Sequence, residues 1–134
     1  MKAEAIFIMT MAMIDEMTDT GQLDETTTAE YKAKAPSILT MLQNEIIGIE
    51  NRYRKQSEMV YPVPIKTLEQ SVQIDDIKAN TLLTNGLAAN LMLHEDKALA
   101  GYFEQRYEEL KGMFLKPTPK KPESKEDIYG GLNY

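Results

Sequence analysis

The sequence contains no cysteine and a single histidine, and each shortage rules out a class of site. Without thiols the chain has no disulfide, no thiolate zinc site and no cysteine nucleophile, and it does not match a small secreted scaffold held by disulfides. His94 is followed by Glu95, as at the start of a zinc-protease helix, but the second histidine of that motif is absent. A lone histidine near a helix end is more often a capping or surface residue. We therefore expect neither a metal ion nor a cofactor.

Basic residues are also scarce, which bears on nucleic-acid binding. The chain has 15 lysines and arginines against 21 aspartates and glutamates, a net charge of −6. Residues 116–134 hold four lysines against three carboxylates, so residues 1–115 carry a net charge of −7. A protein that holds the phosphate backbone needs a basic excess, because counterion release supplies most of that affinity. An acidic body of this kind is expected to repel DNA rather than bind it.

No apolar run is long enough to cross a membrane. The most apolar stretch, residues 5–14, has about half of the ~20 residues that a transmembrane helix needs. Asp15 and Glu16 follow it directly, and the small-residue cleavage site of a signal peptide does not. We expect this stretch to be a buried core helix, and we expect no membrane partner.

What the sequence does contain is a helical pattern of apolar residues at three- and four-residue steps. It predicts four helices, over residues 3–18, from Thr27 or Thr28 to Tyr53, over residues 77–94 and over residues 97–114. Pro36 must either kink the second helix or open a new one. Gly86 and Gly101 interrupt the last two helices beside alanines, which indicates close helix–helix contacts. Short connections between four helices predict an all-α fold, a small bundle spanning residues 1–115.

One long connection, residues 56–74, interrupts this bundle. Within it, Tyr61-Pro62-Val63-Pro64-Ile65 is held extended by its prolines, and residues 72–74 alternate like a very short strand. About twenty residues with little regular structure is long for a compact domain, which indicates a functional loop. We predict that Tyr61, Val63 and Ile65 bind a partner.

Several acidic and glycine-containing stretches match catalytic or ligand-binding motifs only in part. Asp75 and Asp76 could form a carboxylate pair for acid–base catalysis, but no partner base or nucleophile stands out, and capping of the following helix explains them. The acidic residues around Gly21 lack the spacing of a calcium loop. The glycines at residues 130–131 are not followed by the helix and the Lys-Ser/Thr pair of a phosphate loop. We predict that the chain is not an enzyme.

Residues 116–134 differ in kind from the helical body. Three prolines in Lys-Pro-Thr-Pro-Lys-Lys-Pro make residues 116–122 a stiff spacer that is incompatible with a helix. An apolar tip follows, and its predicted partner-binding residues are Ile128, Tyr129, Leu132 and Tyr134. Fully extended, the segment would reach ~60 Å. We therefore predict an extended C-terminal arm, residues 116–134, that docks onto another protein.

Simple energetics indicates that one such arm binds weakly. Burying the four apolar side chains of the tip yields ~6–12 kcal/mol at ~1.5–3 kcal/mol each. Ordering the backbone of residues 128–134 costs a similar amount at ~1–2 kcal/mol per residue. The arm would gain strength by pairing with a neighbour's strand, or when many copies act together in a ring. The alternative is an ordinary frayed end, or a tail folded back onto its own bundle.

Two stretches resemble a known family. They are residues 28–46 (TAEYKAKAPSILTMLQNEI) and residues 74–111 (IDDIKANTLLTNGLAANLMLHEDKALAGYFEQRYEELK). An Asp-Asp opening, a Gly-Leu-Ala-Ala helix, an acidic Glu-Asp turn and a Tyr-Glu-Glu-Leu helix are similar to those of the helical head–tail connector, or neck adaptor, proteins of siphophages that infect Gram-positive bacteria. The match covers nearly half of the chain.

The resemblance implies a non-enzymatic virion protein at the head–tail interface, present in the host cytoplasm during assembly. Its subunits would form a ring, commonly twelvefold, beneath the portal protein, and would extend the DNA channel toward a downstream neck or tail-completion protein. DNA would pass through without specific binding. The arm would bind the portal protein or a neighbouring subunit, and residues 56–74 would form a second contact or a channel element.

The alternative from a different class is a small helical nucleic-acid-binding phage regulator or packaging factor. It would need clustered basic residues, and only Arg52-Tyr53-Arg54-Lys55 and Lys120-Lys121 offer such clusters. Salt-dependent binding to duplex DNA would favour this alternative over the connector.

Overall fold

The computed structural model describes residues 1–17 and 25–115, most of which are helical. In chain order the elements are α1 (Ala3–Met17), α2 (Glu25–Asn51), the 3₁₀ turn η1 (Gln56–Glu58), α3 (Asp76–Lys78), the π-helical turn η2 (Ala79–Leu83), α4 (Thr84–Met92) and α5 (Lys97–Phe114). α3, η2 and α4 follow one another without a break and form the third helix of the bundle. The predicted all-α fold is confirmed. The predicted arm, with its four docking residues, lies outside the described residues.

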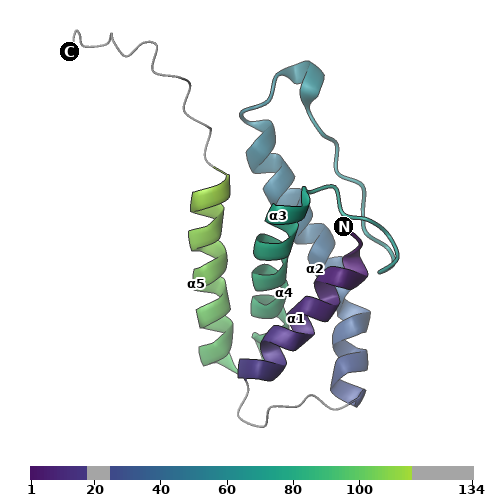
Figure 1. Ribbon diagram of the computed structural model, residues 1–134, viewed down its shortest axis with the longest axis vertical. Helices are drawn as coiled ribbons and strands as arrows, with labels where there is room; N and C mark the ends of the chain where they lie inside the picture. The colour runs from purple at the N-terminus through teal and green to yellow at the C-terminus, as the bar shows by residue number, and fades with distance from the viewer. Residues whose placement is uncertain (18–24, 116–134) are drawn as a thin grey trace, which may run out of the picture.

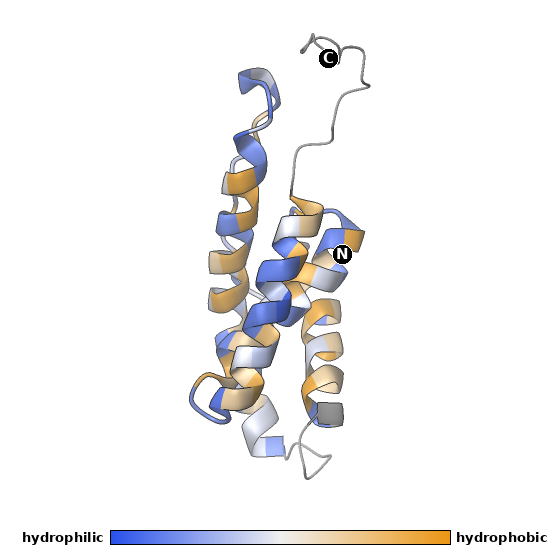
Figure 2. Cartoon of the chain, turned by 90° about the vertical axis from the view of Figure 1, so that its left-hand side faces the viewer, coloured by the Kyte–Doolittle hydropathy of each residue, from blue (hydrophilic) through white to orange (hydrophobic). Residues whose placement is uncertain are grey.

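The third helix lies at the centre of the bundle. It contacts α1, α2 and α5, and Figure 1 shows α5 running alongside it at one edge of the molecule. Figure 2 shows hydrophobic and hydrophilic residues interspersed along the helices. This is the pattern of amphipathic helices that bury one face and leave the other in water.

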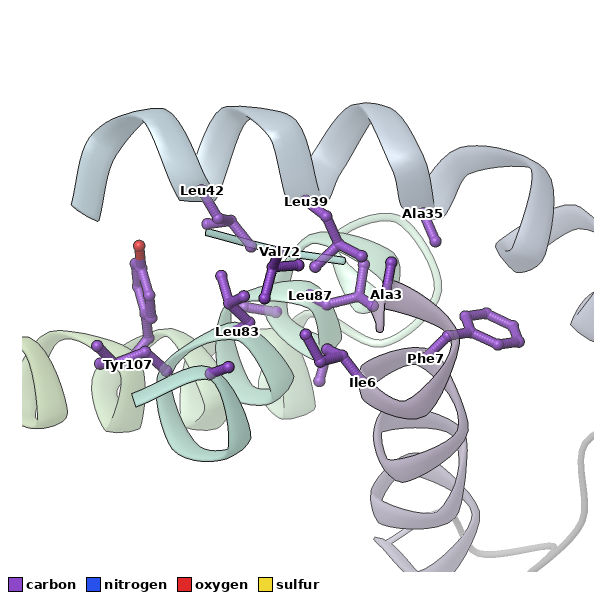
Figure 3. Close-up of a cluster of buried hydrophobic side chains, with 14 of the residues drawn as sticks. Ala3, Ile6, Phe7, Ala35, Leu39, Leu42, Val72, Leu83, Leu87 and Tyr107 are labelled. Carbon is purple, nitrogen blue, oxygen red and sulfur yellow. The ribbon is translucent and has the colours of Figure 1, made fainter. Parts of the chain in front are cut away.

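Side chains from three helices meet in one hydrophobic core. Figure 3 shows Leu39 and Leu42 of α2 on the side that faces Leu83 and Leu87 of the third helix, with Ile6 of α1 close by. Each of these five residues is at most 3 % exposed. Full burial of such a side chain contributes ~1.5–3 kcal/mol. The third helix buries five large apolar side chains, those of Leu82, Leu83, Leu87, Leu91 and Met92.

α2 is a single helix with Pro36 inside it. Of the two alternatives for this proline, the start of a new helix is therefore wrong. Proline has no N–H to donate, so the turn before it lacks one backbone hydrogen bond. One turn further on, the Thr40 hydroxyl donates to the Pro36 carbonyl at 2.9 Å.

A π-helical turn, η2, lies inside the third helix, and the apolar periodicity does not predict it. Side chains bond the carbonyls of this turn. Thr84 Oγ1 donates to the Asn80 carbonyl at 2.6 Å, and Asn85 Nδ2 donates to the Thr81 carbonyl at 2.8 Å. Thr84 and Asn85 are 2 % and 7 % exposed, so these bonds satisfy polar groups that would otherwise be costly in the core.

Of the two glycines predicted to mark close helix contacts, only one does. At Gly86 an added Cβ would lie 2.9 Å from Leu42 Cδ1 and 3.1 Å from Tyr107 Cε1, so this glycine lets α2 and α5 approach the third helix. At Gly101 an added Cβ would meet nothing within 4 Å, and the residue is exposed. The prediction for Gly101 is wrong because no atom of another described helix comes close to this position.

α5 has its predicted bounds, but not all of its large apolar side chains face inward. Phe103, Tyr107 and Leu110 are buried, whereas Tyr102 is 46 % exposed and Met113 is 71 % exposed. α5 lies at the edge of the bundle (Figure 1), so only a narrow stripe of its surface meets the third helix. Tyr102 and Met113 therefore leave apolar surface exposed on the outer side of α5.

Candidate functional site

The long connection predicted between the second and third helices is present and lies against α2. After η1 the chain runs back alongside α2 before it turns toward α3 (Figure 1). We call residues 59–64 the presented segment. Side chains of α2, and of the part of the connection that follows the presented segment, make hydrogen bonds to its backbone. They take the place that a neighbouring strand would have in a sheet.

The bonding begins at the end of α2 with Asn51. Its Nδ2 donates to the Val60 carbonyl at 2.8 Å, and its Oδ1 accepts from the Val60 N–H at 3.0 Å. One amide side chain thus satisfies both backbone groups of Val60. This fixes the start of the presented segment relative to α2.

Two glutamines hold the middle of the presented segment. Gln43, on α2, is fully buried and donates to the Val63 carbonyl at 3.0 Å. Its Oε1 accepts from the Gln73 N–H at 2.7 Å. The Gln73 side chain accepts from the Val63 N–H at 2.6 Å and donates to the Tyr61 carbonyl at 3.1 Å. The Gln43–Gln73 pair therefore ties α2, the presented segment and the chain before α3 together.

Thr40 and Gln70 hold the far end of the extended chain. Thr40 Oγ1 accepts from the Ile65 N–H at 2.8 Å. The Gln70 side chain accepts from the Lys66 N–H at 3.0 Å and donates to the Pro64 carbonyl at 2.7 Å. Together with the bonds of Asn51 and of the Gln43–Gln73 pair, these bonds hold the backbone in place from Val60 to Lys66.

The three predicted loop residues differ in exposure. Tyr61 is 75 % exposed and Val63 is 54 % exposed, so both expose apolar surface, and their role in partner binding stays a prediction. Ile65 is only 3 % exposed and packs in the hydrophobic core. The prediction for Ile65 therefore needs correction: this side chain anchors the extended chain and is not accessible to a partner. Met59, which was not predicted, is 38 % exposed and joins Tyr61 and Val63.

The prolines decide how a partner could recognise the presented segment. Pro62 and Pro64 have no N–H, so an added strand would find no regular row of donors on this chain. Recognition therefore falls to the side chains, chiefly those of Tyr61 and Val63. A fixed backbone lowers the entropy cost of such binding.

The returning part of the connection caps α1. The Ala3 N–H donates to the Gln70 carbonyl at 2.9 Å, and the Glu4 N–H donates to the Leu68 carbonyl at 2.8 Å. These are N–H groups that the first turn of a helix leaves without a partner of its own. Residues 72–74, predicted to alternate like a very short strand, form no strand, and the neighbouring Ser71 makes an isolated antiparallel bridge to Lys2.

A polar cluster joins α2 to α5. The Tyr107 hydroxyl donates to Glu45 Oε1 at 2.8 Å, and Lys111 Nζ donates to Glu45 Oε2 at 2.6 Å. Burial raises the pKa of Glu45, but the bonds from Lys111 and Tyr107 outweigh burial and hold the pKa below its ordinary value. Burial lowers the pKa of Lys111, but its bonds to Glu45 and Glu108 outweigh burial and raise it. The cluster stabilises the charged forms of Glu45 and Lys111 and so holds α2 and α5 together.

Glu45→Gln should lower the free energy of unfolding by about 1 kcal/mol at neutral pH and by much less near pH 3. Hydrogen bonds to charged groups contribute ~1.5–3 kcal/mol, and screening by water reduces this because the Glu45 side chain is 44 % exposed. A lowered folded pKa gives stability that is present above the ordinary value of 4.5 and is lost as the pH falls through the folded pKa.

Urea unfolding of both proteins at the two pH values measures this difference. Glu30→Gln, at an exposed carboxylate of α2, is the control and should change stability by less than ~0.5 kcal/mol at either pH. An equal loss at both pH values in Glu45→Gln would contradict the role assigned to the charge.

The basic residues after α2 are partly occupied. Arg54 donates to Asn51 Oδ1 at 2.8 Å and pairs with Glu50 at 3.2 Å. Arg52 and Lys55 are exposed. The Glu50 carboxylate partly neutralises the charge of Arg54, which weakens its attraction for a phosphate. The geometry thus lends the nucleic-acid-binding alternative little support.

The remaining candidate residues serve the fold. Asp75 caps the third helix by accepting from the Lys78 N–H at 3.2 Å, which confirms the capping interpretation. His94 is exposed. Residues 1–17 and 25–115 contain no group of three or more acidic or histidine side chains that could hold a metal ion. Within those ranges no helix combines the length and the apolar character needed to span a membrane.

The residues that bond the presented segment were not predicted from the sequence. Among them, only Gln43 could have been recognised from the sequence, because it is a polar residue on the face of α2 that the apolar pattern predicts to be buried. The bonds of Thr40, Asn51, Gln70 and Gln73 depend on how the connection folds back, which no local pattern encodes.

Comparisons with protein-family models, with curated proteins and with solved structures found no match.

Proposed function

We propose that this chain is a non-enzymatic virion structural protein, a head–tail connector whose copies form a ring beneath the portal protein and extend the DNA channel toward the tail. The observation that carries the proposal is the presented segment. It holds the exposed side chains of Tyr61 and Val63 on a backbone that the fully buried amide of Gln43 and the exposed amide of Gln73 bond in place. Such a surface suits a permanent protein contact, because little order has to be gained on binding.

The stretches that carry the family resemblance support this proposal. Residues 28–46 lie within α2, and residues 74–111 contain the third helix and most of α5. Within them, Asp75 caps the third helix and Gly86 is the point where α2 and α5 approach it. The resemblance thus concerns residues that set the architecture of the bundle.

The charge of the body supports a channel element. Residues 1–115 carry a net charge of −7, and an acidic wall does not hold the phosphate backbone of passing DNA. We propose that DNA passes the ring without specific binding. The location would be the head–tail interface of the virion, with assembly in the host cytoplasm.

The arm, residues 116–134, would supply the second contact. Its apolar tip, Ile128, Tyr129, Leu132 and Tyr134, would bind the portal protein or a neighbouring subunit. A downstream neck or tail-completion protein would then attach to the assembled ring. Because one arm binds marginally, the proposal depends on many copies acting together.

Truncation after Leu115 tests this proposal. Leu115 is 5 % exposed and its N–H donates to the Lys111 carbonyl, so the truncated chain keeps its last core residue. Full-length and truncated proteins are each mixed with portal protein, and rings are counted by negative-stain electron microscopy. We expect an unchanged helical circular dichroism spectrum and a loss of portal-bound rings on truncation. Rings that form equally well without residues 116–134 would reduce the arm to a frayed end.

The connector proposal as a whole fails if the full-length protein stays monomeric at high concentration, with and without portal protein, and virions lack it. Submicromolar, salt-dependent binding to duplex DNA in the same preparations would favour the regulator or packaging factor instead.

A further inference from the structure

A groove of about 380 Å³ lies between the end of α4 and the start of α5. Its apolar lining is Ala89, Leu93, Ala100 and Gly101, and Leu93 is 50 % exposed. Since Gly101 has no side chain and an added Cβ there would meet nothing within 4 Å, the α5 side of the groove is open. Lys97 and Glu104 also line it and provide charged groups. The groove therefore accepts an apolar side chain with a polar tip.

The presented segment and the groove lie on different sides of the molecule. The presented segment is bonded to Gln43 and Asn51 of α2. The groove is formed by α4 and α5, and α5 lies at the opposite edge of the bundle from the long connection in Figure 1. A single copy therefore cannot place its own presented segment in its own groove, but a second copy can.

The two surfaces carry opposite charge. Residues 50–66, around the presented segment, hold four basic and two acidic residues, a net charge of +2, with Arg54 paired to Glu50. Residues 94–111, which include the turn before α5 and the α5 wall of the groove, hold five acidic and three basic residues, a net charge of −2, with Glu108 paired to Lys111. Two copies of a chain with a net charge of −6 repel each other overall, so contact is favoured where these opposite regions meet.

We propose that the presented segment of one copy docks in the α4–α5 groove of the next copy, with Tyr61 inserted between Leu93 and Gly101. This inference rests on the proposed ring and names its subunit contact. The ring of Tyr61 would cover the apolar lining, and its hydroxyl would reach Lys97 or Glu104 at the rim. Because each copy offers one segment and one groove, the contact is head-to-tail, and such a contact generates a closed ring when the rotation between copies closes.

One such contact is small. A single inserted segment buries less than the ~1,200 Å² that a stable pairwise interface usually needs. Two isolated copies are therefore expected to associate weakly. In a closed ring every copy makes the contact twice, and breaking the ring requires two contacts to open together.

The lack of native cysteine makes disulfide trapping a clean test of the contact. Full-length Val63→Cys protein is mixed with full-length Lys97→Cys protein at about 1 mM, where even a contact with millimolar Kd is substantially populated. Gly112→Cys replaces Lys97→Cys as the control, since Gly112 lies on α5 outside the groove and an added Cβ there meets nothing within 4 Å. We expect about tenfold more mixed disulfide with Lys97→Cys than with Gly112→Cys.

Equal yields from Lys97→Cys and Gly112→Cys would overturn the proposed contact. The arm is the other candidate occupant of the groove, and Asn133→Cys tests it in the same mixture. A higher yield of Lys97→Cys with Asn133→Cys than with Val63→Cys would assign the groove to the arm and would also overturn the proposal.

Filling the groove provides a second test. Gly101→Trp and Gly112→Trp both place a side chain where there is room, so both are expected to keep the helical spectrum of the wild type. Gly101→Trp should weaken self-association in sedimentation by about tenfold or more, and Gly112→Trp should not. If Gly101→Trp assembles like the wild type, the proposed contact between the presented segment and the groove is wrong, and the connector proposal is unaffected. If the wild type builds no ring even with portal protein, the connector proposal itself fails.

Discussion

Gln43→Ala should lower the free energy of unfolding by about 3 kcal/mol and release the presented segment from α2. Gln43 is fully buried and bonds to the Val63 carbonyl and to the Gln73 N–H and side chain. Alanine leaves these groups without their partner, and each buried polar group left unsatisfied costs ~1–3 kcal/mol. The space left by the shorter side chain adds to the loss. The expected loss of stability is not larger because Gln73 is exposed, so water can bond the groups of Gln73 that lose Gln43.

Hydrogen exchange locates this effect, and urea unfolding gives its size. The Val63 N–H, which donates to Gln73 Oε1, should lose protection in Gln43→Ala. The Val60 N–H, which donates to Asn51, should keep most of its protection. Gln105→Ala, at an exposed glutamine of α5, is the matched control and should change stability by less than ~0.5 kcal/mol. A loss below about 1 kcal/mol in Gln43→Ala, with Val63 still protected, would contradict the role of the glutamine pair.

Gly86→Val should lower the free energy of unfolding by about 2–3 kcal/mol, since overpacking a filled core costs ~1–3 kcal/mol and occasionally more. Even a Cβ at this position would lie 2.9 Å from Leu42 Cδ1 and 3.1 Å from Tyr107 Cε1, and valine adds two methyl groups. Leu42 and Tyr107 are both 3 % exposed, so neither can move into water. The helix propensity gained by replacing glycine, a few tenths of a kcal/mol to ~1 kcal/mol, offsets only part of this cost.

Gly101→Val is the matched control for this prediction, because it makes the same substitution inside a helix where the added Cβ meets nothing within 4 Å. Thermal and urea unfolding of the two variants should differ in sign, with Gly101→Val neutral or slightly more stable than the wild type. Two variants of equal stability would show that the third helix is not held as tightly between α2 and α5 as the structure indicates.

These two glycines show where sequence patterns stop being informative. Both lie inside helices beside alanines, so the sequence predicts the same role for each. An added Cβ would touch two neighbouring helices at Gly86 and nothing within 4 Å at Gly101, and this difference depends on the arrangement of the bundle. The helices themselves were predictable, because apolar periodicity and caps such as Asp75 and Asp96 are local properties.

The candidate site was predictable only in part, for a similar reason. The prolines predict an extended chain, and alternation along such a chain would place Tyr61, Val63 and Ile65 on one side. Ile65 instead packs in the core, where its N–H bonds to Thr40 and draws the chain onto α2. The amides that fix the backbone come from residues that are distant in the sequence, so their role depends on the complete fold.

If the connector proposal is right, a phage encodes this chain, and electron cryo-microscopy of that phage's virions tests the proposal most directly. We expect a ring of this chain immediately beneath the portal protein, with its helical bundle around the DNA channel. Virions in which other proteins fill the space between portal and tail, and in which this chain is absent, would contradict it.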